Sequence, residues 1–148
     1  MPEQETIERA RQDEREGKAP STQAGEFVRE EMEHIREGKH GAASTKQAIA
    51  IGLSKARRAG VKLPPPRKGK ASARVRKQAK RDLAKGKGSR RTSPKRARAS
   101  RRALRRQPRS AASHRALSRQ TRAAAKKRTA ADRSRAARKA ARTRKRKK

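Results

Sequence analysis

The stretch STKQAIAIGLSKARRAG, residues 44–60, decides the fold class of this chain. Ser44 and Gln47 have the spacing of a capping box. In such a box the first side chain accepts a hydrogen bond from the backbone amide three residues later, and the side chain of that later residue accepts one from the backbone amide of the first. Apolar side chains then recur at i, i+4 and i+7, the period of one helical face, at Ile49, Leu53 and Ala56. The pattern therefore predicts a helix that begins after Ser44.

Both ends of this helix are marked in the sequence. Gly60 follows the last turn, where a left-handed residue favours glycine, and three prolines at 64–66 prevent any continuation. A similar helix is predicted over residues 23–37 and ends at Gly38. Its apolar face carries Val28, Met32 and Ile35.

A short repeat links these helices to a third one. The tetrad Arg-Glu-Gly-Lys occurs at residues 15–18 and again at 36–39, and each copy is followed by Ser-Thr, at 21–22 and 44–45. One interpretation is a duplicated helix–turn unit that stacks three helices; the other is two similar helix ends that arose by chance. A helix over residues 5–16 has a single large apolar side chain, Ile7, so we expect it to be marginal in isolation.

Charge divides the chain into a head and a tail. The 148 residues include 48 Lys and Arg against 13 Asp and Glu, a net charge of +35. Residues 1–40 carry −4, residues 41–66 carry +5 and residues 67–148 carry +34. We therefore expect an acidic, marginally helical segment over 1–20, a helix-turn-helix-like head over 21–63, a Pro/Gly-rich linker over 64–70 and a basic tail over 71–148.

The composition excludes several classes of protein. One aromatic residue and 41% charged residues leave too little apolar surface for a core along the whole chain. The absence of cysteine excludes disulfides and thiolate metal sites. Apolar runs of only four or five residues predict neither a membrane span nor a signal peptide, so we expect a cytoplasmic protein. The predicted fold class is mostly α: a small helical head of two or three helices followed by a long, largely disordered tail.

The tail has the composition of a polyanion binder. Arginine, which meets phosphate bidentately, outnumbers lysine by 23 to 13 from residue 67 onward. Mutual repulsion predicts disorder in solution, and the alanine content predicts helix over 73–85 and 122–143 once phosphates neutralise the charge. The expected nucleic-acid-binding side chains are Arg67, Lys68, Lys70, Arg74, Arg76, Lys77, Arg90, Arg91, Lys95, Arg96, Arg101, Arg102, Arg105, Arg106, Lys126, Lys127, Arg128, Arg138, Lys139, Arg142, Arg144, Lys145 and Arg146.

Two resemblances accompany these patterns. The tail, which contains the turn-like tetrad Ser-Pro-Lys-Arg at 93–96, resembles the C-terminal tails of linker histones and bacterial histone-like proteins, although it is richer in arginine and poorer in proline. Residues 22–64, from Thr-Gln-Ala-Gly-Glu-Phe-Val to Leu-Pro, resemble a small bacterial family of unknown function that pairs a short helical head with a basic tail. The second resemblance implies a bacterial origin and no particular activity.

These observations predict a histone-like, nucleoid-associated protein that binds DNA without sequence specificity. The tail has no aromatic residue, so base stacking is excluded and the affinity must come from phosphates. RNA or ribosome binding by the same tail stays open, with DNA favoured. A third interpretation is a protein-interaction module. In that case the head would bind a second copy of itself or another protein, and the tail would only localise the module. A DNA-reading helix would instead expose Lys46, Lys55, Arg57 and Arg58.

No enzymatic activity is predicted. The carboxylates at Glu30, Glu31 and Glu33 lack a core large enough to tune their pKa values, and the glycines form no phosphate-binding loop. His34 and His40 lie near Glu30 and Glu37, with His34 four residues after Glu30, but the sequence shows neither a third convergent ligand nor groups to orient one. We therefore expect no catalytic residue, no metal and no cofactor.

Overall fold

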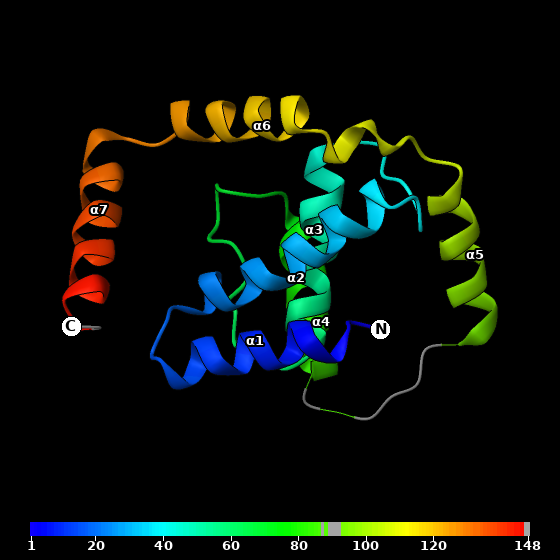
Figure 1. Ribbon diagram of the computed structural model, residues 1–148, viewed down its shortest axis with the longest axis horizontal. Helices are drawn as coiled ribbons and strands as arrows, with labels where there is room; N and C mark the ends of the chain where they lie inside the picture. Colours follow the sequence, from blue (N-terminus) through cyan, green and yellow to red (C-terminus); the bar gives the residue numbers. More distant parts are fainter. Residues whose placement is uncertain (87, 89–92, 147–148) are drawn as a thin grey trace. The chain divides into compact units, whose positions relative to one another are not determined.

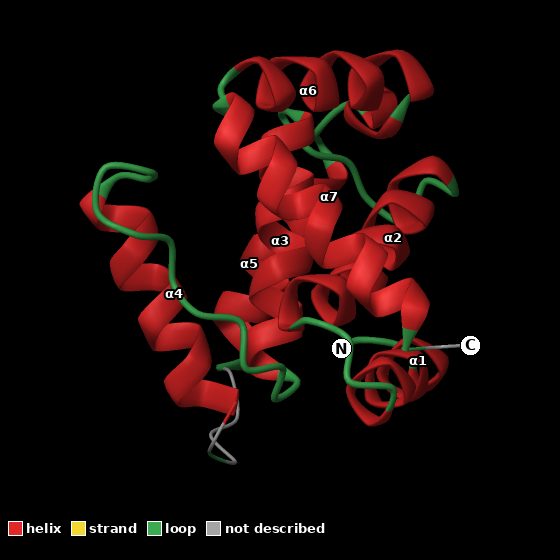
Figure 2. Cartoon of the chain, turned by 90° about the vertical axis from the view of Figure 1, so that its left-hand side faces the viewer, coloured by secondary structure: helices red, strands yellow, loops and turns green. Residues whose placement is uncertain are grey.

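The computed structural model describes residues 1–86, 88 and 93–146. Figure 2 shows helices joined by loops, and the one β contact among the described residues is an isolated bridge between Lys68 and Ala71. Two compact units divide the chain, Met1–Ser113 and His114–Lys148. The elements are α1 (Gln4–Arg15), α2 (Pro20–Arg36), α3 (Thr45–Arg58), α4 (Ala73–Gly86), α5 (Pro94–Arg105), the 3₁₀ helix η1 (Arg109–Ala112), α6 (His114–Lys126) and α7 (Ala130–Lys145).

The core of the first unit lies where its first helices pack in sequence. Helix α1 packs on α2, α2 on α3 and α3 on α4 (Figure 1). Phe27 is the largest buried side chain, and around it lie Ile7, Ala10, Ala24, Leu53, Ala56, Val61 and Leu63. The helix expected near residues 5–16 therefore exists, and contact with α2 supplies the stability that its own sequence lacks.

Small side chains make up the buried face of α3. Thr45, Ala48, Gly52 and Ala56 are buried, whereas Ile49 and Leu53 are only half-buried. Of the predicted apolar face, Ala56 is fully buried and Leu53 packs against the core, so the prediction is confirmed at these two positions. The buried face is nevertheless shifted toward Ala48 and Gly52. The reason is the close approach of α2, because a Cβ atom on Gly52 would lie 2.7 Å from the Cα atom of Val28.

The predicted helix ends are largely confirmed. The Ser44 hydroxyl accepts a hydrogen bond from the Gln47 amide at 3.2 Å, although the Gln47 side chain returns to the amide of Ala43 rather than to that of Ser44. Gly38 and Gly60 end α2 and α3 with φ of 81° and 102°, a conformation that favours glycine. Helix α2 begins earlier than predicted, with Pro20 in its first turn, where the missing amide proton costs nothing.

The expectation of a largely disordered tail is wrong. Helices α4, α5, α6 and α7 occupy most of the described residues after position 72. Alanine, arginine and lysine are strong helix formers, and this propensity outweighs charge repulsion over these lengths. Local signals fix the starts: Pro94 opens α5, and Thr129 with Asp132 forms a complete capping box on α7.

The predicted tail segments match the helices in part. The segment 73–85 corresponds to α4, whereas 122–143 combines the end of α6 with most of α7 and is interrupted between them. Helix α5 was expected in neither segment. Among the described residues, no helix is both long enough and apolar enough to span a bilayer.

Two polar contacts attach basic segments to the head. Asp82 of α4 is buried and accepts hydrogen bonds from Ser54 Oγ and Arg58 Nε, each at 2.8 Å, and from Gln78 Nε2 at 3.1 Å. The end of α5 and the segment after it meet the α2–α3 turn, where backbone amides of the turn donate to carbonyl oxygens of that segment. These bonds are Gly41 N to Leu104 O at 2.9 Å and Ala42 N to Pro108 O at 3.1 Å.

Candidate nucleic-acid interface

The predicted binding residues are almost all exposed. Arg90 and Arg91 lie outside the described residues. Of the others, Arg67, Lys68 and Lys70 precede α4. Helix α4 carries Arg74, Arg76 and Lys77, and α5 carries Lys95, Arg96, Arg101, Arg102 and Arg105, with Arg106 as its cap. Lys126 ends α6, Lys127 and Arg128 follow it, and α7 carries Arg138, Lys139, Arg142, Arg144 and Lys145, with Arg146 as its cap.

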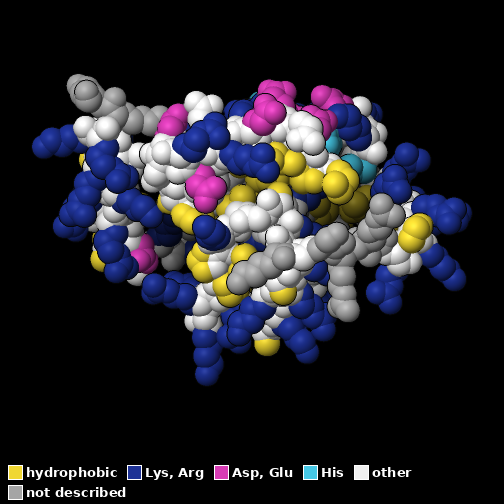
Figure 3. Space-filling model, turned by 90° about the horizontal axis from the view of Figure 1, so that it is seen from below, with side chains coloured by type: hydrophobic (Ala, Val, Ile, Leu, Met, Phe, Trp, Pro, Cys, Tyr) yellow, Lys and Arg dark blue, Asp and Glu magenta, His cyan; other side chains and the backbone are white. Residues whose placement is uncertain are grey.

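These cations have no acidic partners within the described part of the chain. The ion pairs there involve other basic residues, most of them in the head, such as Arg29 with Glu26 and Lys62 with Glu14. On the face shown in Figure 3, Lys and Arg side chains project outward over much of the surface, and Asp and Glu side chains gather mainly along the upper edge. A surface of uncompensated, solvated cations binds polyanions readily, since neutralising phosphates releases their condensed counterions.

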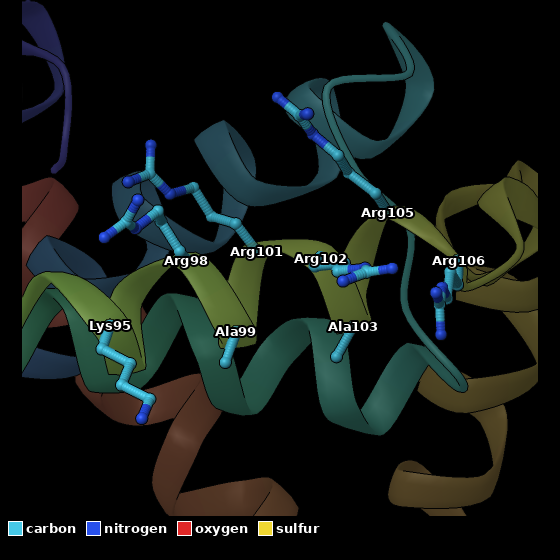
Figure 4. Close-up of a pocket in the computed structure, with 8 residues that line it drawn as sticks. All are labelled: Lys95, Arg98, Ala99, Arg101, Arg102, Ala103, Arg105 and Arg106. Atoms are coloured by element: carbon cyan, nitrogen blue, oxygen red, sulfur yellow. The ribbon is translucent and has the colours of Figure 1, made fainter.

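Helix α5 brings several of these cations close together. A hollow of about 1050 Å³ runs along it, and its charged lining consists of Lys95, Arg98, Arg101, Arg102, Arg105 and Arg106. Figure 4 shows the Arg98 and Arg101 side chains extending from one side of the helix and Ala99 and Ala103 from another. Because like charges gathered along one helix repel each other, a bound anion would stabilise this arrangement.

Arg76 of α4 is the one described member of the predicted set that is partly buried. Its Nε atom is shielded from solvent and has no hydrogen-bond acceptor among the described residues. A smaller hollow of about 260 Å³ adjoins it, lined also by Pro65, Pro66, Ala73, Lys77 and Lys80. Lys77 and Lys80 are exposed beside this partly buried guanidinium, so their ammonium groups are the ones that a phosphate oxygen can reach.

Helix α7 presents its cations without burying any side chain. Arg138 and Arg142 are four residues apart, so they lie on one face about 6 Å apart along the axis. Asp132, the only acid in this helix, lies at its N-terminus. It exchanges hydrogen bonds with Thr129, and its carboxylate forms an ion pair with Arg135. Hydrogen bonds from Arg135 and then from Thr129 hold the pKa of Asp132 below its ordinary value. The acid therefore caps the helix and leaves the later cations uncompensated.

The cations expected on a DNA-reading helix are mostly used inside the head. Lys55 pairs with Glu31 at 2.7 Å, and Arg58 is bound to Asp82. Arg57 is buried and donates to the carbonyl oxygen of Leu63 at 3.1 Å. Only Lys46 of that set is exposed without a described partner. Helix α3 is thus packed against α2 and α4 and does not present these groups to a groove.

Sequence reasoning missed two residues that shape this surface. Arg98 lines the α5 hollow. It precedes Arg101 and Arg102 by three and four residues, so a helix predicted over this segment would have placed the three arginines near one another. Asp82 contributes only one negative charge to the sequence pattern, yet it attaches α4 to α3. Its spacing of four from Gln78 was a visible signal, whereas its contacts with α3 depend on the tertiary fold.

Comparison with known proteins gives one similarity. Residues 15–69 match a family of unknown function, DUF6496, which agrees with the expected resemblance of the head to such a family. The match ends before α4, so the resemblance of the tail to linker-histone tails is not shown, and DNA binding and nucleoid association gain no support from it. No curated protein and no solved structure matched this chain.

Proposed function

We propose that this protein binds duplex DNA through its phosphates, without sequence specificity, using the exposed cations of α4 to α7. The observation that carries the proposal is that the described cations predicted to bind are free of acidic partners. Preformed helices add to it, because part of the ordering cost of binding has then already been met. The tail has no aromatic side chain, which leaves phosphate contact as the source of affinity.

The test compares two triple variants of the full chain that each remove three positive charges. The first replaces Arg138, Arg142 and Lys145 of α7 by Gln. The matched control replaces Arg29, Lys39 and Lys62 by Gln; their side chains are 53%, 50% and 87% exposed, and each pairs with an acid. Both variants keep every residue of the apolar core.

Binding is measured by fluorescence anisotropy against two unrelated duplexes of equal length. At about 0.1 M salt the α7 variant should weaken binding to both duplexes equally, by up to about 500-fold if all three groups contact phosphate. The head variant should bind within a few-fold of the unmodified chain. Equal losses in the two variants would contradict the assignment of binding to the basic helices, and tighter binding of a structured RNA at matched salt would contradict DNA as the ligand.

A further inference from the structure

A cluster of nitrogen and oxygen ligands lies at the end of α2, away from the basic helices. Glu31 and His34 belong to α2, and His40 belongs to the turn that follows it. Each offers one ligand atom, and these atoms lie within 4.8 Å of one another. Glu31 is fully buried, whereas the two histidine side chains are 12% and 16% exposed, so the cluster opens to solvent on the histidine side.

The ring of His40 directs one nitrogen at Glu31. Its Nδ1 lies 3.1 Å from the carbonyl oxygen of Gly41, which can only accept, so Nδ1 donates there. The other ring nitrogen, Nε2, lies 3.2 Å from Glu31 Oε1. Nε2 and Oε1 therefore face each other at a separation that one cation bound by both atoms would bridge.

Glu31 is a buried carboxylate with unused binding capacity. Neither of its oxygens accepts a hydrogen bond of good geometry among the described residues, although Lys55 Nζ lies 2.7 Å from Oε2. Burying a charged oxygen without such a bond is costly. Lys55 compensates the charge at Oε2, and Oε1 stays available toward His40.

His34 is oriented in the way that metal-binding histidines usually are. Its Nε2 lies 2.8 Å from the carboxylate of Glu3, which holds the ring proton on that nitrogen. The remaining nitrogen, Nδ1, lies 3.8 Å from Oε1 of the buried Glu30, another oxygen without a hydrogen-bond donor. A carboxylate behind a ligating histidine fixes the ring and raises its basicity. The backbone carbonyl behind His40 acts in the same way.

The donor set discriminates between cations. Two imidazole nitrogens and one carboxylate oxygen suit Zn²⁺ and its neighbours, whereas Mg²⁺ and Ca²⁺ prefer oxygen ligands only. Ligand atoms around tetrahedral Zn²⁺ lie about 3.4 Å apart. The Glu31–His40 pair already meets this spacing, and since all three atoms lie within 4.8 Å of one another, the other pairs must close by at most about 1.4 Å. Glu30 or a water molecule would complete the tetrahedron.

We propose that Glu31, His34 and His40 form a binding site for one divalent transition-metal ion of the Zn²⁺ type. The ion would join the end of α2 to the following turn, whose Gly41 and Ala42 amides hold the segment after α5.

The test is a titration of the untagged, chelator-treated full chain with Co²⁺, followed by the visible d–d bands of the four-coordinate ion. The matched variants are His40→Ala and His114→Ala, since His114 is exposed on α6 outside the cluster. We expect one equivalent of Co²⁺ to bind to the unmodified chain and to His114→Ala, and Zn²⁺ but not Mg²⁺ to displace it. His40→Ala should lose the bands.

A milder variant covers the case in which His40→Ala loses its helix, as judged by circular dichroism of the metal-free protein. Glu3→Gln keeps all three ligands and removes only the carboxylate behind His34, so it should bind Co²⁺ about tenfold more weakly. Failure of the unmodified chain to bind one equivalent would overturn the proposal. Unchanged Co²⁺ affinity in a folded His40→Ala or in Glu3→Gln would overturn it as well.

Discussion

Replacing Gly52 with Ala should destabilise the head, even though alanine is the better helix former. The added Cβ would lie 2.7 Å from Val28 Cα and 3.0 Å from Phe27 O, well inside the 3.5–4.0 Å or so of a relaxed carbon contact. Both atoms belong to the α2 backbone, so relief requires α2 and α3 to separate. Overpacking of this kind costs about 1–3 kcal/mol, and the gain in helix propensity returns about 1 kcal/mol.

Gly25 provides the matched control, because it lies within α2 and a Cβ there would meet nothing within 4 Å. Gly25→Ala should raise the free energy of unfolding by about 1 kcal/mol, so the two variants should differ by about 1–3 kcal/mol. Hydrogen exchange of α2 and α3 amides in urea measures the free energy of unfolding of the head in each variant. The unfolding of α5 to α7 does not contribute to the signal of these amides. A Gly52→Ala chain that is stabilised as much as the Gly25→Ala chain would refute the close helix contact.

Two further predictions concern helices α4 and α7. Asp82→Ala removes the hydrogen-bond acceptor of Ser54 and Arg58, so α4 amides should lose about 2 kcal/mol of exchange protection while α1 amides keep theirs. Equal protection of α4 in the variant and in the unmodified chain would contradict the role of Asp82 in attaching α4 to α3. The charged form of Asp132 caps α7, and its folded-state pKa is lowered, so this stability is complete above the ordinary carboxyl pKa and is lost as pH falls through the lowered value. NMR of α7 amides in the unmodified chain should show fraying of the first turn as pH falls through the lowered pKa. In Asp132→Asn the first turn should be independent of pH. Fraying at the same pH in the unmodified chain and in the variant would exclude loss of the Asp132 cap as the cause.

The sequence allowed the head to be predicted better than the tail. Local signals act within one turn, which is why Ser44, Gly38 and Gly60 were placed correctly as helix ends. The buried face of α3 was predicted correctly at Leu53 and Ala56 and missed at Ala48 and Gly52. The apolar period favours large side chains, whereas the observed contact selects these two residues for their small size. The small side chains are required because α2 approaches α3 closely, and the sequence of α3 alone does not give that distance.

The error in the tail came from weighing two opposed local effects. Charge repulsion was expected to prevail over the helix propensity of alanine and arginine, and the capping box at Thr129 and Asp132 was not recognised. The cluster of Glu31, His34 and His40 was missed for another reason. The sequence shows Glu31 and His34 three residues apart, but the position of His40 depends on the turn after α2, and that of Glu3 on how α1 packs.

The measurement that tests the central claim most directly is the salt dependence of DNA binding by the full chain. If ten of the 36 cations after residue 66 contact phosphate, the logarithm of the association constant should fall against the logarithm of salt concentration with a slope of about −9. The α7 triple variant should reduce the steepness by about 2.7, and the head triple variant should leave it unchanged. A slope shallower than about −3 in the unmodified chain, or the same slope in the unmodified chain and the α7 variant, would contradict phosphate binding by the basic helices.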